Sequence, residues 1–215
     1  FCMEEVKAYF AIFTAATLLI AFNILSQMGN VGDSLRHAAF QVASIMTTTG
    51  FATTDFDQWP EFSRTLLVML MFIGACAGST GGGIKVSRIL MYMKTIKKEL
   101  GILIHPRSVK IVMMDGKKLD HPVVRAANIF LISYAGILVA SILLLTIDNF
   151  DFTTNVTAVI SALNNIGPGL SLVGPAGNFA FFSGFSKYVL MFDMLAGRLE
   201  IFPMLLLFVP YTWKK

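Results

Sequence analysis

The sequence predicts an all-α membrane protein with two parallel repeats, each made of an outer helix, a short re-entrant helix that runs into a glycine turn, and an inner helix. Of the 215 residues, 55% are hydrophobic and only 14% are charged, whereas soluble domains carry about 25% charged residues. So little charge excludes an ordinary soluble domain. The other two observations are a basic segment flanked by apolar stretches and an order of segments that occurs twice.

Four apolar segments are candidate spans. Ala8–Ser26 and Val123–Ile147 are each long enough to cross about 30 Å of hydrocarbon. Thr65–Ala77 runs into a glycine-rich stretch, and Tyr188–Val209 carries charged residues and a proline. Irregular backbone inside a membrane occurs only where it lines a cavity or is buried in protein. We therefore expect the smooth spans to be scaffold and the interrupted spans to carry the function.

A semi-polar stretch lies between each smooth span and the interrupted span that follows it. In the first, Asp33-Ser34 is a candidate helix start before the short pattern Leu35–Met46. In the second, Thr153-Thr154 precedes the pattern Asn155–Leu163. Both patterns are too short to cross a membrane and run into a turn that contains glycine. Each stretch therefore predicts a re-entrant hairpin.

Basic residues are concentrated in one part of the chain. Ten of the 17 Lys and Arg residues lie in Lys85–Arg125, beside only three acidic residues. The apolar flanks favour a cytoplasmic segment under the positive-inside rule over a nucleic-acid patch. The semi-polar stretches then lie outside, where their acidic residues concentrate cations. Both termini are expected on the cytoplasmic side, in agreement with Lys214-Lys215, and Met113–Lys118 predicts a hairpin turn within the basic segment.

The sequence also contains a weak internal repeat. With Gly50 placed on Gly167, three further pairs fall in register: Ser44 with Ser161, Thr48 with Asn165, and Thr54 with Ser171. We therefore divide the chain into a first repeat at 1–100, a cytoplasmic basic linker at 101–121 and a second repeat at 122–215. Parallel repeats surround an axis along the membrane normal. Because two repeats supply two walls of a four-sided pore, we expect a C-terminal fragment that lacks two more repeats.

The turn after each short helix predicts ion coordination. Potassium filters are built from backbone carbonyls in loops of the T-V-G-Y-G type, and glycine allows successive carbonyls to point the same way. Residues 48–52 read T-T-G-F-A, and residues 165–169 read N-I-G-P-G. An ordinary glycine turn is the alternative for either loop alone. Two such turns at equivalent positions favour ion sites.

Four longer motifs carry a resemblance to a known family. They are T-T-T-G-F-A-T-T-D-F at Thr47–Phe56, G-A-C-A-G-S-T-G-G-G-I-K at Gly74–Lys85, N-N-I-G-P-G-L at Asn164–Leu170, and M-L-A-G-R-L-E-I at Met194–Ile201. With them the sequence resembles the C-terminal half of the Trk/Ktr/HKT superfamily of potassium transporters, most closely the bacterial TrkH-type subunit.

The resemblance implies that each repeat consists of an outer helix, a re-entrant pore helix with a filter loop, and an inner helix. These would be the third and fourth of four repeats in one polypeptide. The resemblance further implies a homodimer in the bacterial inner membrane that binds a cytoplasmic, nucleotide-binding regulatory subunit of the TrkA-like kind.

It also implies the residues that bind the ion. Carried over by position, the filter glycines of the family fall on Gly50 and Gly167. The carbonyls that would hold potassium belong to Thr48, Thr49, Asn165 and Ile166, and the filter loops would be completed by Phe51 and Pro168. Potassium is then the transported ion, and no organic cofactor is expected on this chain.

The glycine-rich stretch of the first interrupted span predicts a gate. Its residues are Gly78, Ser79, Thr80, Gly81, Gly82 and Gly83. Each glycine costs about 0.8–1 kcal/mol relative to alanine in a helix, so the stretch is not expected to be helical. A phosphate-binding loop is disfavoured because Ile84 separates the last glycine from Lys85. A close-packed glycine interface between helices remains open, and the resemblance favours a loop that closes the pore.

Arg198 is an unusual charge within the second interrupted span. A cation in a span costs at least about 2.5–3.5 kcal/mol on insertion scales and is a functional candidate. Asp193 and Glu200 lie five and two residues away, not at the three or four that favour pairing on a helix, and we interpret them as structural counter-charges. We expect Arg198 to face the pore or the glycine loop. Snorkelling to the cytoplasmic interface is the alternative.

The sequence thus predicts potassium uptake through a pore with one filter glycine per repeat, gated by the glycine loop and Arg198. The alternative is a non-conducting scaffold, or another cation channel, that binds a cytoplasmic partner through the basic segment. We expect no enzyme, because the sequence shows no nucleophile–base pair. Cys2 and Cys76 lie far apart, which excludes a disulfide framework or a structural zinc site. The expected partners are membrane lipid, a second copy and the regulatory subunit, not nucleic acid.

Overall fold

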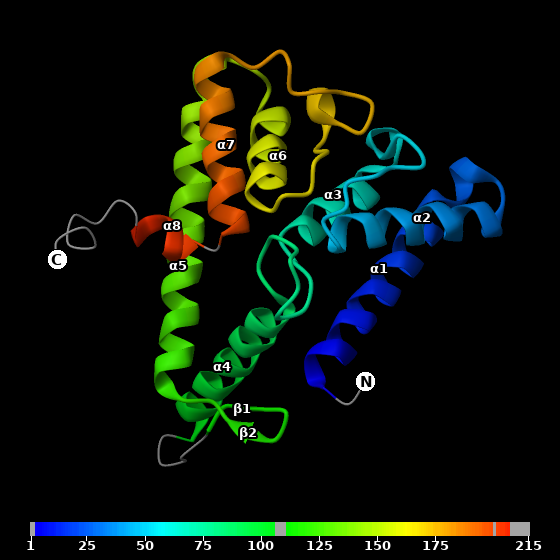
Figure 1. Cartoon of the computed structure of the whole chain (residues 1–215). Coiled ribbons are helices and arrows are strands. Elements are labelled where there is room, and N and C mark those ends of the chain that lie inside the picture. The colour runs from blue at the N-terminus through cyan, green and yellow to red at the C-terminus, as the bar shows by residue number, and fades with distance from the viewer. Residues whose placement is uncertain (1–2, 106–110, 200, 207–215) are drawn as a thin grey trace.

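The computed structural model describes residues 3–105, 111–199 and 201–206, and most of these are helical (Figure 1). The helices are α1 (Glu4–Met28), α2 (Val31–Met46), α3 (Glu61–Met71), α4 (Val86–Ile104), α5 (His121–Leu145), α6 (Phe152–Leu163), α7 (Gly184–Arg198) and α8 (Ile201–Leu206). The short elements are β1 (Met113–Met114), β2 (Lys117–Lys118), η1 (Phe56–Gln58), η2 (Thr146–Asp148) and η3 (Ser171–Val173). The expectations for Glu200 and Lys214-Lys215 lie outside the described residues.

The two smooth spans form α1 and α5, of 25 residues each. At 1.5 Å per residue each exceeds the thickness of the hydrocarbon core. Only 22% of the most apolar window of each helix is buried, whereas the core helix of a soluble protein would be mostly buried. Large apolar side chains such as Phe22 and Ile132 are exposed instead. The composition and exposure of both helices suit contact with lipid.

The short helices α2 and α6 begin earlier than the sequence predicted. The cap of α2 is Asn30, whose side chain accepts from the N–H of Gly32 at 3.0 Å. The cap of α6 is Asp151, which accepts from the N–H of Thr154 at 2.9 Å. The expected starts at Asp33-Ser34 and Thr153-Thr154 are therefore wrong. Asn and Asp are the strongest N-caps, and each stands one residue before an apolar first helical residue.

Both interrupted spans are broken where the sequence interrupts them. Helix α3 ends at Met71, residues 72–85 are not helical, and α4 begins at Val86. Helix α7 ends at Arg198, and α8 begins at Ile201. Figure 1 shows the non-helical stretch between α3 and α4 near the middle of the molecule.

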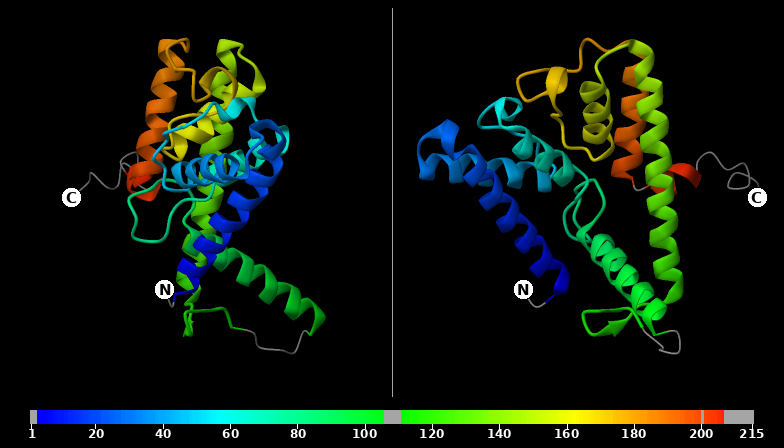
Figure 2. Two further views of the ribbon diagram at one scale, coloured as in Figure 1. Left: turned by 90° about the vertical axis from the view of Figure 1, so that its right-hand side faces the viewer. Right: turned by 180° about the vertical axis from the view of Figure 1, so that it is seen from behind.

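The basic segment is partly helical. Helix α4 occupies its first part and continues to Ile104, across the boundary expected at residue 100. The predicted hairpin turn is confirmed: Met113 pairs with Lys118, and Met114 with Lys117. Figure 2 shows the hairpin at the same end of the molecule as the beginnings of α1 and α5 and the end of α4.

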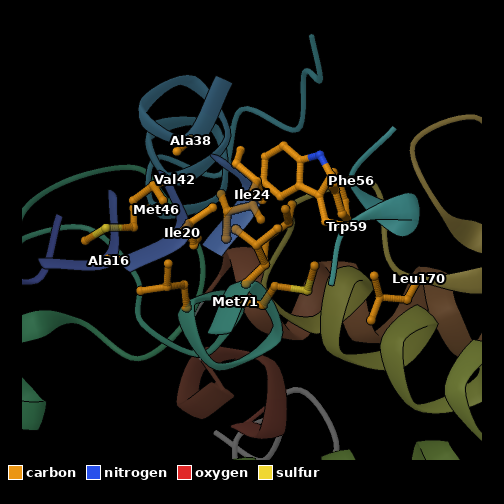
Figure 3. Packing of buried hydrophobic residues seen from close by; sticks show 14 of the residues in the cluster. Ala16, Ile20, Ile24, Ala38, Val42, Met46, Phe56, Trp59, Met71 and Leu170 are labelled. Carbon is orange, nitrogen blue, oxygen red and sulfur yellow. The ribbon is translucent and has the colours of Figure 1, made fainter. Parts of the chain in front are cut away.

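A buried apolar cluster joins the two repeats. Its side chains come from α1, α2 and α3 and from Phe56 and Trp59 in the loop between α2 and α3. The second repeat contributes Ile160, Ile166 and Leu170. Figure 3 shows Ile20 and Ile24 of α1 between the side chains of α2 and those of the loop. The core therefore reaches from the end of α2 to the turn after α6. It fixes the turns that follow these two helices relative to each other.

Candidate functional site

The turns after α2 and α6 follow the same backbone path. After α2, the N–H of Thr49 donates to the carbonyl of Ser44 at 2.8 Å. After α6, the N–H of Ile166 donates to the carbonyl of Ser161 at 3.0 Å. The offset between these pairs is the one that aligns the two glycines in the sequence. The internal repeat is therefore present in the hydrogen bonds of the backbone.

Both turns depend on left-handed backbone. Thr48 and Asn165 occupy equivalent positions with φ of 54° and 55°, and Gly50 and Gly167 have φ of 77° and 115°. A Cβ atom on Gly50 would lie 2.1 Å from the carbonyl oxygen of Ile166. A side chain at residue 50 would therefore collide with the other turn, and the two turns approach each other backbone to backbone.

A buried serine supports each turn. The hydroxyl of Ser44 donates to the carbonyl of Phe51 at 2.6 Å. The hydroxyl of Ser161 accepts from the N–H of Gly167 at 3.1 Å. The sequence alignment paired these two serines without giving them a role. The signal was present: each hydroxyl stands six residues before the glycine of its turn.

A cavity of about 760 Å³ lies between the two turns and α7. Of the predicted filter residues, those that line it are Thr48, Thr49, Asn165, Ile166 and Gly167, and those that do not are Gly50, Phe51 and Pro168. The side chain of Phe51 is 71% exposed. Lys187 also lines the cavity, and its ammonium is held by the carbonyl of Ala180 at 2.7 Å.

The glycine-rich stretch is a loop whose ends are joined. The N–H of Gly74 donates to the carbonyl of Ile84 at 2.9 Å, and the N–H of Ile84 donates to the carbonyl of Phe72 at 3.0 Å. These bonds leave the residues between them as a closed loop attached to the ends of α3 and α4. We call residues 74–83 the glycine loop.

The glycine loop packs directly against the turns. A Cβ atom on Gly82 would lie 2.2 Å from the carbonyl oxygen of Asn164, and one on Gly81 would lie 3.3 Å from the hydroxyl oxygen of Thr48. Only glycine fits at residue 82. The side chain of Asn164 is fixed in turn, because it accepts from the hydroxyl of Tyr134 at 2.9 Å. Sequence reasoning quoted Asn164 within a motif but assigned it no role.

Two cations bind the carbonyls of the glycine loop. The ammonium of Lys85 donates to the carbonyls of Ser79 at 2.9 Å and Gly81 at 2.5 Å. The guanidinium of Arg198 donates to the carbonyl of Thr80. A cavity of about 160 Å³, lined by Lys85, Arg88 and Arg198 among others, lies beside the loop. The loop is thus held from its own helix and from the inner helix of the second repeat.

Asp193 lies apart from this cation cluster. It is buried between α7 and α5, where its carboxylate accepts from the hydroxyl of Ser141 at 2.7 Å. Within the described residues, no contact joins the carboxylate of Asp193 to Arg198, so its interpretation as a counter-charge is not supported by a contact. Asp193 instead joins α7 to the outer helix α5.

Two carboxylates beside α6 have a pKa below the ordinary value. The N–H of Ser183 donates to Asp148 at 2.9 Å and lowers the pKa of that carboxyl below its ordinary value. The hydroxyl of Thr154 donates to Asp151 and lowers the pKa of Asp151 in the same way. Hydrogen bonds to the charged form favour it. Both residues lie between α5 and α6, at the end of α5 opposite the basic hairpin.

Known proteins are similar to this chain in sequence and in fold. Residues 9–215 match the family described as TrkH, cation transport protein. The chain is 39% identical over 203 residues to the Trk system potassium uptake protein TrkH of Salmonella typhimurium, which covers 93% of this chain and 42% of that protein. It is 44% identical over 182 residues to the protein of the same name in Vibrio parahaemolyticus, covering 85% of this chain and 37% of that protein.

A solved structure agrees along nearly the whole chain. The crystal structure of the potassium transporter TrkH from Vibrio parahaemolyticus superposes with a TM-score of 0.89 at 40% identity, over 98% of this chain and 45% of that chain. This confirms the predicted all-α membrane fold. The chain spans less than half the length of these relatives. The family match and the superposition together show that the chain belongs to the TrkH family of cation transport proteins.

Proposed function

We propose that this chain forms two sides of a pore through which potassium ions enter the cell across its membrane. The observation that carries the proposal is the pair of equivalent turns, which meet at Gly50 and line one cavity. The relatives are named potassium uptake proteins, which supports potassium as the ion. Transport of this kind needs no covalent chemistry and no organic cofactor.

In this proposal the two turns are the selectivity filter. The carbonyls of Thr48, Thr49, Asn165 and Ile166 replace part of the hydration shell of the potassium ion. The equivalent left-handed residues Thr48 and Asn165 support a shared role for the two turns, because the same strained backbone recurs where both turns line the cavity. The acidic outer face raises the local concentration of cations at the entrance.

We further propose that the glycine loop is the gate, together with Arg198. Packing of the loop against Asn164 and near Thr48 supports this, since a loop beside the filter turns obstructs the path of the ion. Arg198 adds a positive charge beneath the filter, which opposes the passage of cations. Opening then requires the loop to leave the carbonyl contacts with Arg198 and Lys85.

A larger transporter belongs to the same proposal, since the chain spans less than half the length of its relatives. We propose that two further repeats of the same kind complete the pore, and that repeats at 1–100 and 122–215 flank a cytoplasmic basic linker at 101–121. Both ends of the chain lie on the cytoplasmic side of the bacterial inner membrane in this proposal. A homodimer and a nucleotide-binding regulatory subunit of the TrkA-like kind on the basic face belong to the same proposal.

Substitution Gly50→Ala tests the filter. The added methyl group meets the carbonyl of Ile166, and non-glycine residues in such backbone carry strain of about 1–3 kcal/mol. We expect potassium uptake to fall about tenfold or more in cells that depend on this transporter, because each 1.4 kcal/mol is a factor of ten. The matched control is Gly136→Ala, because no atom lies within 4 Å of a Cβ at this position on α5.

The outcome separates the two classes of function. Uptake that stays normal in Gly50→Ala, with the protein present in the membrane at normal amount, would exclude the filter assignment. That result would favour a scaffold that acts through its basic segment. Loss of uptake in both glycine variants would point to a general defect in the fold.

A further inference from the structure

A buried carboxylate contacts both flanks of the glycine loop. Glu5, in the first turn of α1, is 5% exposed. Its Oε1 atom accepts from the N–H of Ala77 at 2.6 Å and from the N–H of Ser87 at 3.0 Å. Ala77 lies within the loop, and Ser87 lies in the first turn of α4, after the loop. One oxygen atom therefore bridges the two sides of the loop.

The contact also supplies α4 with the cap that its own sequence lacks. The residue before α4 is Lys85, which makes no side-chain cap. The first four N–H groups of a helix have no partner within it, and the positive end of the helix dipole favours an anion. Glu5 provides that anion from another helix. Bonds of a carboxylate to N–H groups are charge-assisted and stronger than neutral ones.

The first turn of α1 is itself held in place. The N–H of Glu4 donates to the carboxylate of Asp115 at 2.7 Å, at the tip of the β1–β2 hairpin. The carboxylate of Glu4 binds Lys94 of α4, and the ammonium of Lys94 donates to the carbonyl of Met113 at 2.8 Å. The position of Glu5 is therefore fixed by α4 and the hairpin rather than by the loop that it contacts.

We propose that Glu5 is a positioning residue of the gate, which holds the glycine loop in its closed place and fastens it to α1 and the cytoplasmic hairpin. This inference rests on the proposed function of the loop as the gate. Glu5 does not touch the ion. It acts through Ala77 and Ser87, so that loss of its two hydrogen bonds releases the loop while the filter turns keep their own contacts.

The test compares Glu5→Ala with Glu5→Gln. Both remove the charge, but the amide oxygen of glutamine still accepts from both N–H groups. The reporter is Cys76, a partly buried residue next to Ala77, in the whole transporter with Cys2→Ser as background. We expect a thiol reagent to label Cys76 at least about tenfold faster in Glu5→Ala, from the loss of two hydrogen bonds to a charged group. Glu5→Gln is expected to label clearly more slowly than Glu5→Ala, because it loses the charge but keeps both hydrogen bonds.

Potassium uptake provides the second reading. Glu5→Ala is expected to raise uptake, and Glu5→Gln to raise it clearly less. The matched control is Glu99→Ala, since Glu99 is an exposed carboxylate on α4 paired only with Lys98 among its described contacts. If Glu5→Ala reaches the membrane in low amount, Glu5→Asp replaces it, because the side chain shorter by one methylene cannot bridge both N–H groups.

Each result decides the inference. Parent-like labelling in Glu5→Ala overturns it, whatever the uptake. Equal acceleration in Glu5→Ala and Glu5→Gln also overturns it, because the charge and not the hydrogen bonds would then matter. Faster labelling in Glu5→Ala than in Glu5→Gln, with unchanged uptake, supports Glu5 as the residue that fixes the loop and instead overturns the assignment of the loop as the gate.

Discussion

At the scale of the residue, Thr48 is the unusual member of the two turns that we propose as the filter. Asparagine tolerates the left-handed conformation that Asn165 adopts, but threonine is β-branched and adopts it at a cost of about 1–2 kcal/mol. Thr48 and its hydroxyl also line the contact with Gly81 of the loop. Strain of this kind is concentrated at functional sites, which agrees with a role for this residue in the ion path.

Arg198→Ala should raise potassium uptake. The substitution removes both the bond to the carbonyl of Thr80 and the positive charge beside the glycine loop, which we propose as the gate. Loss of one hydrogen bond to a charged group costs about 1.5–3 kcal/mol, so we expect the closed state to weaken by about tenfold or more. Tracer uptake at equal protein amount measures this. The uptake of Arg198→Lys should lie between that of the parent and that of Arg198→Ala. Reduced uptake in Arg198→Ala would contradict the role of this residue in closing the pore.

At the scale of the element, the N-caps of the two short helices hold them in place. Both helices begin at a side chain that accepts from the first turn, Asn30 for α2 and Asp151 for α6. The short helices are marginal alone, and their C-terminal ends carry the filter turns. A change at the cap therefore acts on the filter through the helix.

Asp151→Ala should destabilise the protein in a way that depends on pH. Removal of an N-cap costs about 1 kcal/mol. Because the folded pKa of Asp151 is lowered, its contribution is complete above the ordinary value of about 3.9 and is lost as the pH falls through the folded value. Thermal unfolding in detergent at neutral and acidic pH measures the effect.

The control for this cap is Asp151→Asn. Asparagine caps as well as aspartate and does not titrate, so this variant should keep the stability of the parent at neutral pH. In the parent, protonation of Asp151 at acidic pH lowers the stability. Asp151→Asn should not show this loss. An equal deficit of Asp151→Ala at every pH would contradict the role of the ionised cap.

At the scale of the whole molecule, one carboxylate joins the two repeats. Asp57 of the first repeat accepts from the N–H of Ser171 in the second at 3.1 Å. It also pairs with Arg64, whose nitrogen lies 3.3 Å from the same carboxylate oxygen. Ser171 follows the second filter turn and has a φ of 59°. Asp57 therefore fixes one repeat to the backbone that supports the filter of the other.

Asp57→Ala should lower stability more than Asp57→Asn. Alanine leaves the N–H of Ser171 and one side of Arg64 without this partner, which costs about 1–3 kcal/mol. Asparagine still accepts from Ser171 and loses only the ion pair. Unfolding of the purified transporter by heat measures the difference. Identical stability of both variants and the parent would show that the two repeats are held together by their apolar core alone.

The sequence predicted the spans, the broken inner helices and the hairpin, because these depend on local pattern. Apolar length predicts a span, runs of glycine predict a break, and Asp115-Gly116 predicts a tight turn. The sequence also paired Gly50 with Gly167, and the structure gives both a positive φ; their place in a filter stays a prediction. The starts of the short helices were missed because the true caps are single residues that stand before an apolar residue.

The contacts that hold the site could not be predicted, because they join residues far apart in the chain. Glu5 and Ser87 are 82 residues apart, and Tyr134 and Asn164 are 30 apart. A glutamate at the start of a span carries the same local signal whether it faces solvent or caps another helix. Only the fold brings such groups together, so the residues that position the glycine loop became visible in the structure alone.

The joined ends of the glycine loop have a kinetic consequence. Since Ile84 is bonded to Phe72 and Gly74, the loop can move without unwinding α3 or α4. Movements of loops take nanoseconds to microseconds, whereas local unfolding takes up to seconds. In a pore closed by this loop, the switching rate is therefore set by how often the bonds of Lys85, Arg198 and Glu5 break together. A regulator that weakens any one of them changes the frequency of opening and not the speed of each movement.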